Sequence, residues 1–247
     1  MSEHARLHSN SQTLSLSFES SLIQSCMRLA DPDELVLDYT RAMMSFLLLN
    51  SNPAHILMIG LGGGSIHKYV HRHLLGTDIT TVEINPGVID LRQDFCIPPD
   101  DERSRILCAD GAAFLSKPSQ SYDVILVDGF TGEGIPDALC SPGFYRRVRA
   151  ALSPQGVMVA NVQADTEQTR EILKRVGRVF DGAVLSFESD EGGNDIVVAS
   201  QVDTLWRAAE GFEARWSELA AIHQTTLAVA STRLQRALQK VPRPNAP

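Results

Sequence analysis

The sequence predicts an α/β fold built on a mostly parallel β-sheet, and three observations support this. From His55 onward, short apolar runs alternate with helical patterns, as in a sheet whose strands are joined by helical crossovers. A glycine-rich turn follows the first apolar run, and acidic residues follow several of the runs. We therefore expect five parallel strands and a terminal antiparallel hairpin, preceded by a short N-terminal β-hairpin and a helix.

The N-terminal region has the pattern of a small hairpin. Residues 1–12 are polar and are expected to be irregular. Residues 13–18 alternate apolar and polar side chains, as in a half-buried strand, and residues 21–29 can pair with them. A helix is then expected to begin at Pro32 and Asp33 and to end between Asn50 and Pro53.

The alternating part of the chain defines the central sheet. Strands are expected at residues 55–60, 79–84, 105–109, 123–128 and 157–162. Helices are expected at residues 65–74, 87–94, 112–116, 142–152 and 166–179. Two further strand-like runs, 183–188 and 195–200, flank the turn-rich Asp190-Glu-Gly-Gly-Asn194, which indicates an antiparallel hairpin.

One or two amphipathic helices are expected over residues 203–239. The expected organisation is an N-terminal segment at 1–50, a nucleoside-binding domain at 51–202 and C-terminal helices at 203–247.

Composition narrows the range of partners and compartments. The 247 residues carry a net charge of −8, which disfavours nucleic acid or an anionic membrane as the main partner. No signal sequence opens the chain and no apolar run is long enough to span a membrane, so a cytoplasmic protein is expected. None of the four cysteines forms a C-x-x-C pair, so no metal site is expected, and Cys108 is expected in the core.

The glycine turn suggests a nucleoside ligand. Gly60, Gly62 and Gly64 allow a tight turn and a close approach of ligand to backbone, and Glu83 follows about 20 residues later, where an acid can meet ribose hydroxyls. A strict dinucleotide spacing would require glycine where the chain has Ser65. A nucleoside without phosphates, such as an S-adenosyl sulfonium, therefore fits better than a dinucleotide, and a purely structural turn is the alternative.

Three acids end three consecutive predicted strands, and ligands of parallel sheets bind beyond those ends. Glu83 can accept hydrogen bonds from both ribose hydroxyls. Asp110, which precedes Gly111, can accept from an adenine amine or can cap a helix. Asp128 can accept a proton from an attacking amine.

These features together resemble the spermidine synthase (polyamine aminopropyltransferase) family, which shares the Rossmann-like sheet of class I S-adenosylmethionine methyltransferases. The resemblance covers about residues 20–200. The motifs that carry it are Ile23-Gln24-Ser25, Asp33-Glu34-Leu35 to Tyr39, Gly60-Leu-Gly-Gly-Gly64, Val82-Glu83-Ile84, Ala109-Asp110-Gly111, Asp123 to Asp128, Phe144-Tyr145 and Gly192-Gly-Asn194.

The resemblance implies a role for each matching residue in polyamine biosynthesis. The turn at Gly60, Gly62 and Gly64 and the acid Glu83 would hold the nucleoside of decarboxylated S-adenosylmethionine. Adenine would be read at Asp110 and Gly111, and the nucleoside pocket would be lined by Gln24. Asp128 would be the general base for a small-molecule amine, assisted by Tyr39. Homodimers are common in the family, so a homodimer is an expectation.

The chain departs from the family pattern at three places. Gly63 stands where the family has an aspartate that anchors the aminopropyl ammonium, and Thr131 replaces a second aspartate that helps to hold the polyamine. Tyr39-Thr40-Arg41 stands where the family has Tyr-His-Glu. Each lost hydrogen bond to a charged group is worth about 1.5–3 kcal/mol, so substrate selection is expected to differ.

Three functions therefore remain open. The first is a spermidine-synthase-like transferase. The second is an S-adenosylmethionine methyltransferase, because with Gly63 nothing at that position repels the carboxylate of the intact donor. The third is a nucleoside-binding protein without catalysis. His67 and His71 are interpreted as helix-packing or surface residues, because no carboxylate motif accompanies them.

Overall fold

In the computed structural model, the described residues are 5–18, 23–117, 120–131 and 134–241. The large sheet contains β4 (His55–Ile59), β5 (Asp78–Glu83), β6 (Ser104–Cys108), β7 (Tyr122–Val127), β8 (Leu152–Gln163), β9 (Val184–Glu188) and β10 (Asn194–Ala199). Its strand order is β6-β5-β4-β7-β8-β10-β9. The five strands from β4 to β8 pair in parallel, whereas β10 pairs antiparallel with both β8 and β9. The predicted sheet with its terminal hairpin is confirmed.

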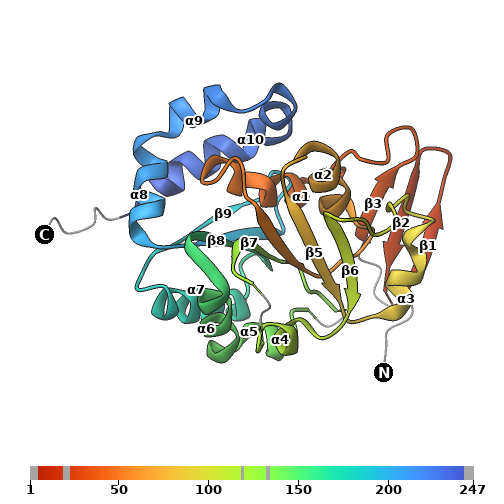
Figure 1. Cartoon of the computed structure of the whole chain (residues 1–247), viewed down its shortest axis with the longest axis horizontal. Coiled ribbons are helices and arrows are strands. Elements are labelled where there is room, and N and C mark those ends of the chain that lie inside the picture. Colours follow the sequence, from red (N-terminus) through yellow and green to blue (C-terminus); the bar gives the residue numbers. More distant parts are fainter. Residues whose placement is uncertain (1–4, 19–22, 118–119, 132–133, 242–247) are drawn as a thin grey trace, which may run out of the picture.

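Helices cover both faces of this sheet (Figure 1). Toward one face lie α1 (Asp38–Met43), the 3-10 helix η1 (Met44–Leu48), α2 (Ser65–His73), α8 (Val202–Glu210), α9 (Phe212–Glu218) and α10 (Ala221–Leu238). Toward the other lie α4 (Gly111–Phe114), α5 (Asp137–Cys140), α6 (Pro142–Ala151) and α7 (Glu167–Val179). The short helices α3 (Pro86–Ile89) and η2 (Asp90–Arg92) follow β5.

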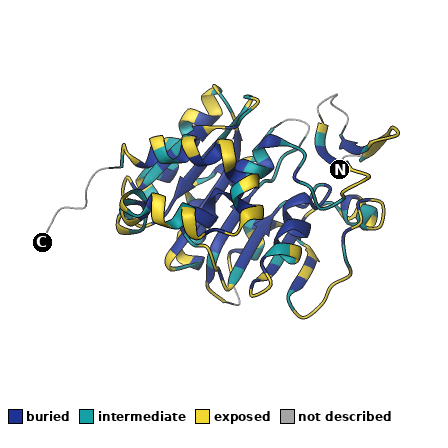
Figure 2. Ribbon diagram, turned by 90° about the horizontal axis from the view of Figure 1, so that it is seen from above, coloured by how far each residue is buried: buried dark blue, intermediate teal, exposed yellow. Residues whose placement is uncertain are grey.

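The central strands are buried on both faces, and alternate residues enter different cores. Ile56 and Met58 pack with η1 and the C-terminal helices, whereas Leu57 and Ile59 pack with α6 and α7. Successive side chains of a strand point to opposite faces, which explains the division. Figure 2 shows the buried strands in the interior and the exposed residues along the outer helix surfaces and turns.

A second, three-stranded sheet forms the N-terminal region from β1 (Arg6–Ser9), β2 (Thr13–Ser17) and β3 (Ile23–Arg28). The predicted pairing of β2 with β3 is confirmed. The expectation that residues 1–12 are irregular is wrong for β1, which pairs antiparallel with β2, while residues 1–4 lie outside the described part. All four β1 residues are exposed, so the strand has no hydrophobic alternation to reveal it.

The helix expected from Pro32 begins later, at Asp38, and continues directly as η1. Two constraints hold the preceding segment in turns. Arg28 forms an ion pair with Glu34, and the Arg41 guanidinium donates to the carbonyls of Leu35 and Val36. The carbonyls that a longer helix would use internally are therefore bound by a side chain.

The C-terminal region contains three helices rather than the expected one or two. The first break falls at Gly211, between α8 and α9. The second falls between Glu218 and Ala221, before α10. Within the described residues, no helix combines the length and the apolar character that spanning a bilayer requires.

Cys108 is exposed, so the expectation that it lies in the core is wrong. It ends β6, which is an edge strand of the large sheet.

Candidate active site

A cavity of about 560 Å³ opens beyond the carboxyl ends of the parallel strands. The cavity lies at the ends of β4 and β7, where the strand order reverses. After β4 the chain adds β5 and β6 on one side of the sheet, and it then adds β7 and β8 on the other side. This reversal of strand order is where open α/β sheets bind ligands. The cavity volume lies in the range of small-molecule sites.

The glycine turn after β4 forms one wall of the cavity. Gly60 has a positive φ of 97°, and a Cβ at this position would lie 2.2 Å from the carbonyl oxygen of Asp128. Gly62 also lines the cavity, with φ of 52°. Gly64 does not line it; this residue precedes α2, and a Cβ there would meet Ile97 at 2.4 Å. Gly60 and Gly62 thus form part of the cavity wall, whereas Gly64 allows close packing against Ile97 away from the cavity.

Glu83 ends β5 as a buried carboxylate that the backbone holds in place. Its Oε2 accepts a hydrogen bond from the amide of Leu61 at 2.8 Å, and its Oε1 accepts one from the amide of Asn85 at 2.8 Å. Each carboxylate oxygen has a second lone pair, so both retain an acceptor site for a ligand. The two amides therefore orient the acid toward the cavity without using up its capacity.

Asp110 follows β6 and caps the first turn of α4. Its Oδ1 accepts a hydrogen bond from the amide of Ala113 at 2.9 Å. The side chain also lines the cavity, beside the buried Gly111. Both interpretations of this acid are compatible, because the cap uses only one of its oxygens.

Asp128 follows β7 and lies beside Tyr39 of α1. Withdrawal from bulk water is the main cause that raises the pKa of Asp128 to about 6, and the charge of Glu83 adds to it. Hydrogen bonds from Asn161 and Tyr39 act in the opposite direction and lower that pKa. Burial, followed by the charge of Asp128, raises the pKa of Tyr39 well above its ordinary value, so the phenol stays neutral.

Two asparagines complete this side of the cavity, and the sequence analysis did not select them as site residues. The amide nitrogen of Asn161 donates to Asp128 Oδ1 at 2.9 Å, and the amide nitrogen of Asn194 donates to Asn161 Oδ1 at 2.9 Å. Both residues line the cavity. A signal was present at Asn161, which is the polar residue within the apolar run of residues 157–162 in β8.

Gln24 lines the cavity from β3. Its backbone carbonyl accepts a hydrogen bond from the Tyr39 hydroxyl at 3.2 Å. The N-terminal sheet and α1 therefore cover the cavity together.

The two substituted positions differ in how the structure uses them. A Cβ at Gly63 would lie 2.8 Å from the Phe95 ring and 3.1 Å from Ser25 Cβ, so these side chains fill the space beside this glycine. Thr131 does line the cavity, and its hydroxyl donates to the carbonyl of Gly134 at 2.9 Å. Neither position supplies a carboxylate.

The cavity is nevertheless acidic. Four carboxylates line it, from Asp38, Glu83, Asp110 and Asp128, whereas no lysine, arginine or histidine is present among the described residues of its wall. One of these acids, Asp38, is the first residue of α1. It is buried, and its carboxylate accepts a hydrogen bond from the backbone amide of Glu191 at 2.6 Å. Such a wall favours cationic ligands.

The histidines of α2 lie away from this cavity. His67 is buried and its ring contacts the hydroxyls of Thr81 and Ser104, each at 2.8 Å. Burial lowers its pKa to about 4, so the ring is neutral. The Nε2 atom of His71 lies 2.8 Å from Asp101 Oδ2, within hydrogen-bond distance. The interpretation of both residues as packing or surface residues is confirmed.

Comparison with known proteins identifies related sequences among polyamine aminopropyltransferases and methyltransferases. The spermine/spermidine synthase domain matches residues 29–187. A polyamine aminopropyltransferase of Chromobacterium violaceum is 40% identical over 210 residues, covering 82% of this chain and 80% of that protein. An eEF1A lysine and N-terminal methyltransferase of Xenopus laevis is 30% identical over 185 residues, covering 68% of this chain but 27% of that protein.

Solved structures share the fold. A probable spermidine synthase from Corynebacterium glutamicum superposes with a TM-score of 0.69 at 19% identity, covering 98% of this chain and 95% of that chain. Human methyltransferase-like protein 13 in complex with SAH gives 0.63 at 24% identity, covering 85% and 96% of the two chains. The fold is thus that of class I methyltransferases and spermidine synthases, and the chain belongs to the spermine/spermidine synthase domain family.

Proposed function

We propose that this protein transfers an aminopropyl group from decarboxylated S-adenosylmethionine to a small-molecule amine. The observation that carries the proposal is the charge of the cavity, whose described wall has four carboxylates and no cationic side chain. The decarboxylated donor and an amine acceptor are both cations, and an acidic wall attracts both. The intact donor carries a carboxylate, which the same wall repels.

The donor half of the cavity comprises Gly60, Gly62, Glu83, Asp110 and Gly111, which line it beyond β4, β5 and β6. The free lone pairs of Glu83 would accept from the ribose hydroxyls, and the free oxygen of Asp110 would accept from the adenine amine. Two further residues support this half: Gln24 lines the cavity and would cover the nucleoside, and Gly64 allows the turn to pack closely against Ile97.

The acceptor half of the cavity comprises Asp38, Tyr39, Asp128, Asn161 and Asn194. Asp128 would be the general base, because its pKa of about 6 leaves it ionised at neutral pH yet basic enough to take a proton. The amine nitrogen would attack the aminopropyl carbon bonded to sulfur. The carbon–sulfur bond would break, methylthioadenosine would leave with the electron pair, and Asp128 would take the nitrogen proton.

A panel of donors and acceptors tests this reaction. Purified protein is incubated with S-adenosylmethionine or its decarboxylated analogue, together with putrescine, cadaverine or spermidine, and products are identified by mass spectrometry. Aminopropylated amine and methylthioadenosine, formed in equal amounts from the decarboxylated donor, are expected. A methylated amine would instead identify a methyltransferase, and no product with any pair would reject both reactions for these acceptors.

Methyl transfer from intact S-adenosylmethionine is the second candidate, and Gly63 favours it. No carboxylate stands at this position, and Phe95 and Ser25 occupy the space beside it. The ammonium group of an aminopropyl donor therefore lacks one anchor that the family pattern provides. The two reactions would use the same base and differ in which carbon of the sulfonium is attacked.

A further inference from the structure

A chain of two asparagine amides ends on the Asp128 carboxylate. Asn194 donates to Asn161, and Asn161 donates to Asp128, each over 2.9 Å. The orientation of this chain is determined by its chemistry, because an ionised carboxylate can only accept hydrogen bonds. Asn161 must turn its nitrogen toward Asp128, and its oxygen then faces the amide nitrogen of Asn194.

We propose that Asn161 and Asn194 are positioning residues that hold Asp128 as an oriented, ionised base. This inference rests on the proposed role of Asp128 and extends it to two residues on β8 and β10. Asn161 is 4% exposed, so water cannot readily replace its amide. A rotated Asn161 amide would place its oxygen against a carboxylate oxygen, which is unfavourable unless Asp128 carries a proton.

Tyr39 cannot replace this function on its own. Its hydroxyl has a single proton, which is shared between Asp128 and the Gln24 carbonyl at 3.2 Å, so it can donate to only one of them at a time. Among the described residues, Asp128 is the acceptor of the Asn161 nitrogen and no second acceptor competes for it. The charge of Glu83 on β5 also acts on Asp128 and raises its pKa, while Asp38 of α1 acts on Tyr39.

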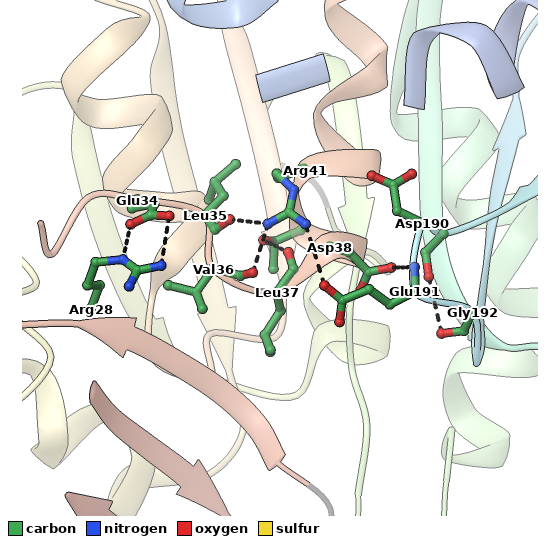
Figure 3. Close-up of polar contacts among 12 residues, drawn as sticks. Arg28, Glu34, Leu35, Val36, Leu37, Asp38, Arg41, Asp190, Glu191 and Gly192 are labelled. Atoms are coloured by element: carbon green, nitrogen blue, oxygen red, sulfur yellow. Dashed lines mark hydrogen bonds and ion pairs between the residues drawn. The ribbon is translucent and has the colours of Figure 1, made fainter. Parts of the chain in front are cut away.

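The turn that precedes Asn194 is fastened from two sides. From α1, Asp38 accepts from the amide of Glu191 at 2.6 Å, and Arg41 lies 4.0 Å from the Glu191 carboxylate (Figure 3). From α10, the Arg233 guanidinium donates to the carbonyls of Glu188 and Ser189 at 2.9 and 2.8 Å. Contacts from two helices therefore fix the start of β10, where Asn194 lies.

Backbone hydrogen bonds around Asn194 also join the start of β10 to the chain segments that follow β8 and β9. The amide of Ala164, just after β8, donates to the carbonyl of Gly193 at 2.9 Å, and the amide of Ser189 donates to the Asn194 carbonyl at 2.8 Å. These backbone bonds hold Asn194 beside Asn161. Both Asn194 and Arg233 lie beyond residues 29–187, the part of the chain that the family domain matches.

The experiment is a titration of the Asp128 carboxyl carbon by NMR in ligand-free protein with 13C-labelled aspartate. The resonance is assigned by its loss in Asp128→Asn. We expect Asn161→Leu, which keeps the approximate volume and removes the donor, to raise the Asp128 pKa by about one to two pH units. Asn194→Leu should raise it by less than about one unit, since it acts through Asn161.

Thr169→Val is the matched control. Thr169 of α7 is buried, and its hydroxyl donates to the carbonyl of Gln163 at the end of β8. Within the described part of the chain it forms no hydrogen bond with Asp128. This variant removes a buried hydrogen bond from the same region and should leave the Asp128 pKa unchanged. Thermal denaturation of all variants identifies any that do not fold, and Asn194→Leu decides the matter if Asn161→Leu fails to fold.

An unchanged Asp128 pKa in folded Asn161→Leu, or in folded Asn194→Leu if it alone folds, would overturn the proposal. A rise equal to that of Thr169→Val would do the same, because it would reflect general loosening. The titration needs no turnover, so it separates this inference from the proposed function. Protein that shows the shift but transfers no group would retain the positioning role and lose the aminopropyl reaction.

Discussion

The two halves of the cavity are built by different means. The donor half depends on local structure: a glycine turn, a strand-end acid held by two backbone amides, and an acid that caps a helix. The acceptor half depends on side chains from α1, β7, β8 and β10, which are distant in sequence. Local elements build the proposed nucleoside site, whereas long-range contacts build the proposed acceptor site, which single substitutions can therefore change more easily.

The largest expected effect is on catalysis in the acceptor half. Asp128→Asn should lower turnover by about 10²- to 10⁴-fold, the usual contribution of a general base, while leaving donor affinity nearly unchanged. Steady-state kinetics with calorimetry of methylthioadenosine binding checks this. Asp137→Asn, an exposed acid on α5, is the control. Full activity of Asp128→Asn would remove this residue from the mechanism.

The donor half should respond in the opposite way. Glu83→Gln should weaken nucleoside binding by about 10- to 100-fold, because the charged acceptor for the ribose is lost and the contacts with Leu61 and Asn85 are disturbed. Calorimetry with methylthioadenosine measures the effect, and the exposed Glu102→Gln serves as control. Unchanged affinity would show that the nucleoside does not bind at Glu83.

The pH profile tests the acceptor half without mutation. Asp128 must be ionised to take a proton, so kcat/KM should rise with pH through about 6 and level off above about pH 7. Tyr39 adds no limb in this range, because its pKa lies well above the ordinary value. A profile that falls from pH 5 to 7 would contradict a base with this pKa.

Stability should show the cost of keeping Asp128 ionised. Its folded pKa of about 6 lies above the ordinary aspartate pKa of 3.8, so the folded state binds the proton more tightly than the unfolded state does. Stability is therefore greatest below about pH 4 for this group and falls as pH rises through 6, by up to about 3 kcal/mol. Thermal melts should show that Asp128→Asn is more stable than wild type at pH 8, and that this stability difference is smaller at pH 4. A stability difference that does not grow between pH 4 and pH 8 would refute the raised pKa of Asp128.

Much of the fold and of the donor half could be predicted from the sequence. Alternating strands and helices, the glycine turn and the acids after β5, β6 and β7 all have local signals. Two features had none: β1 pairs through its backbone with every residue exposed, and Arg41 delays the start of α1. Asn161 stands out in the sequence only as a polar residue in an apolar run, because its partners Asp128 and Asn194 come from other parts of the chain. Long-range pairing decides these features, and no spacing along the chain encodes it.

The smallest expected effect is that of restoring an acid at Gly63, in the donor half of the cavity. Gly63→Asp should destabilise the fold by about 1–3 kcal/mol, because its Cβ would lie 2.8 Å from the Phe95 ring. Gly63→Asp combined with Phe95→Ala, compared with Phe95→Ala alone, should recover part of this loss and strengthen binding of the decarboxylated donor. Chemical denaturation and calorimetry measure both, and a single variant as stable as wild type would show that Phe95 moves freely.

The most direct test of the central claim is calorimetric titration with S-adenosylmethionine, its decarboxylated analogue and methylthioadenosine, side by side. The acidic wall of the cavity predicts that the decarboxylated donor binds most tightly. Tighter binding of intact S-adenosylmethionine would contradict this claim and make methyl transfer the leading reaction. Binding of none of the three would reject the nucleoside site itself.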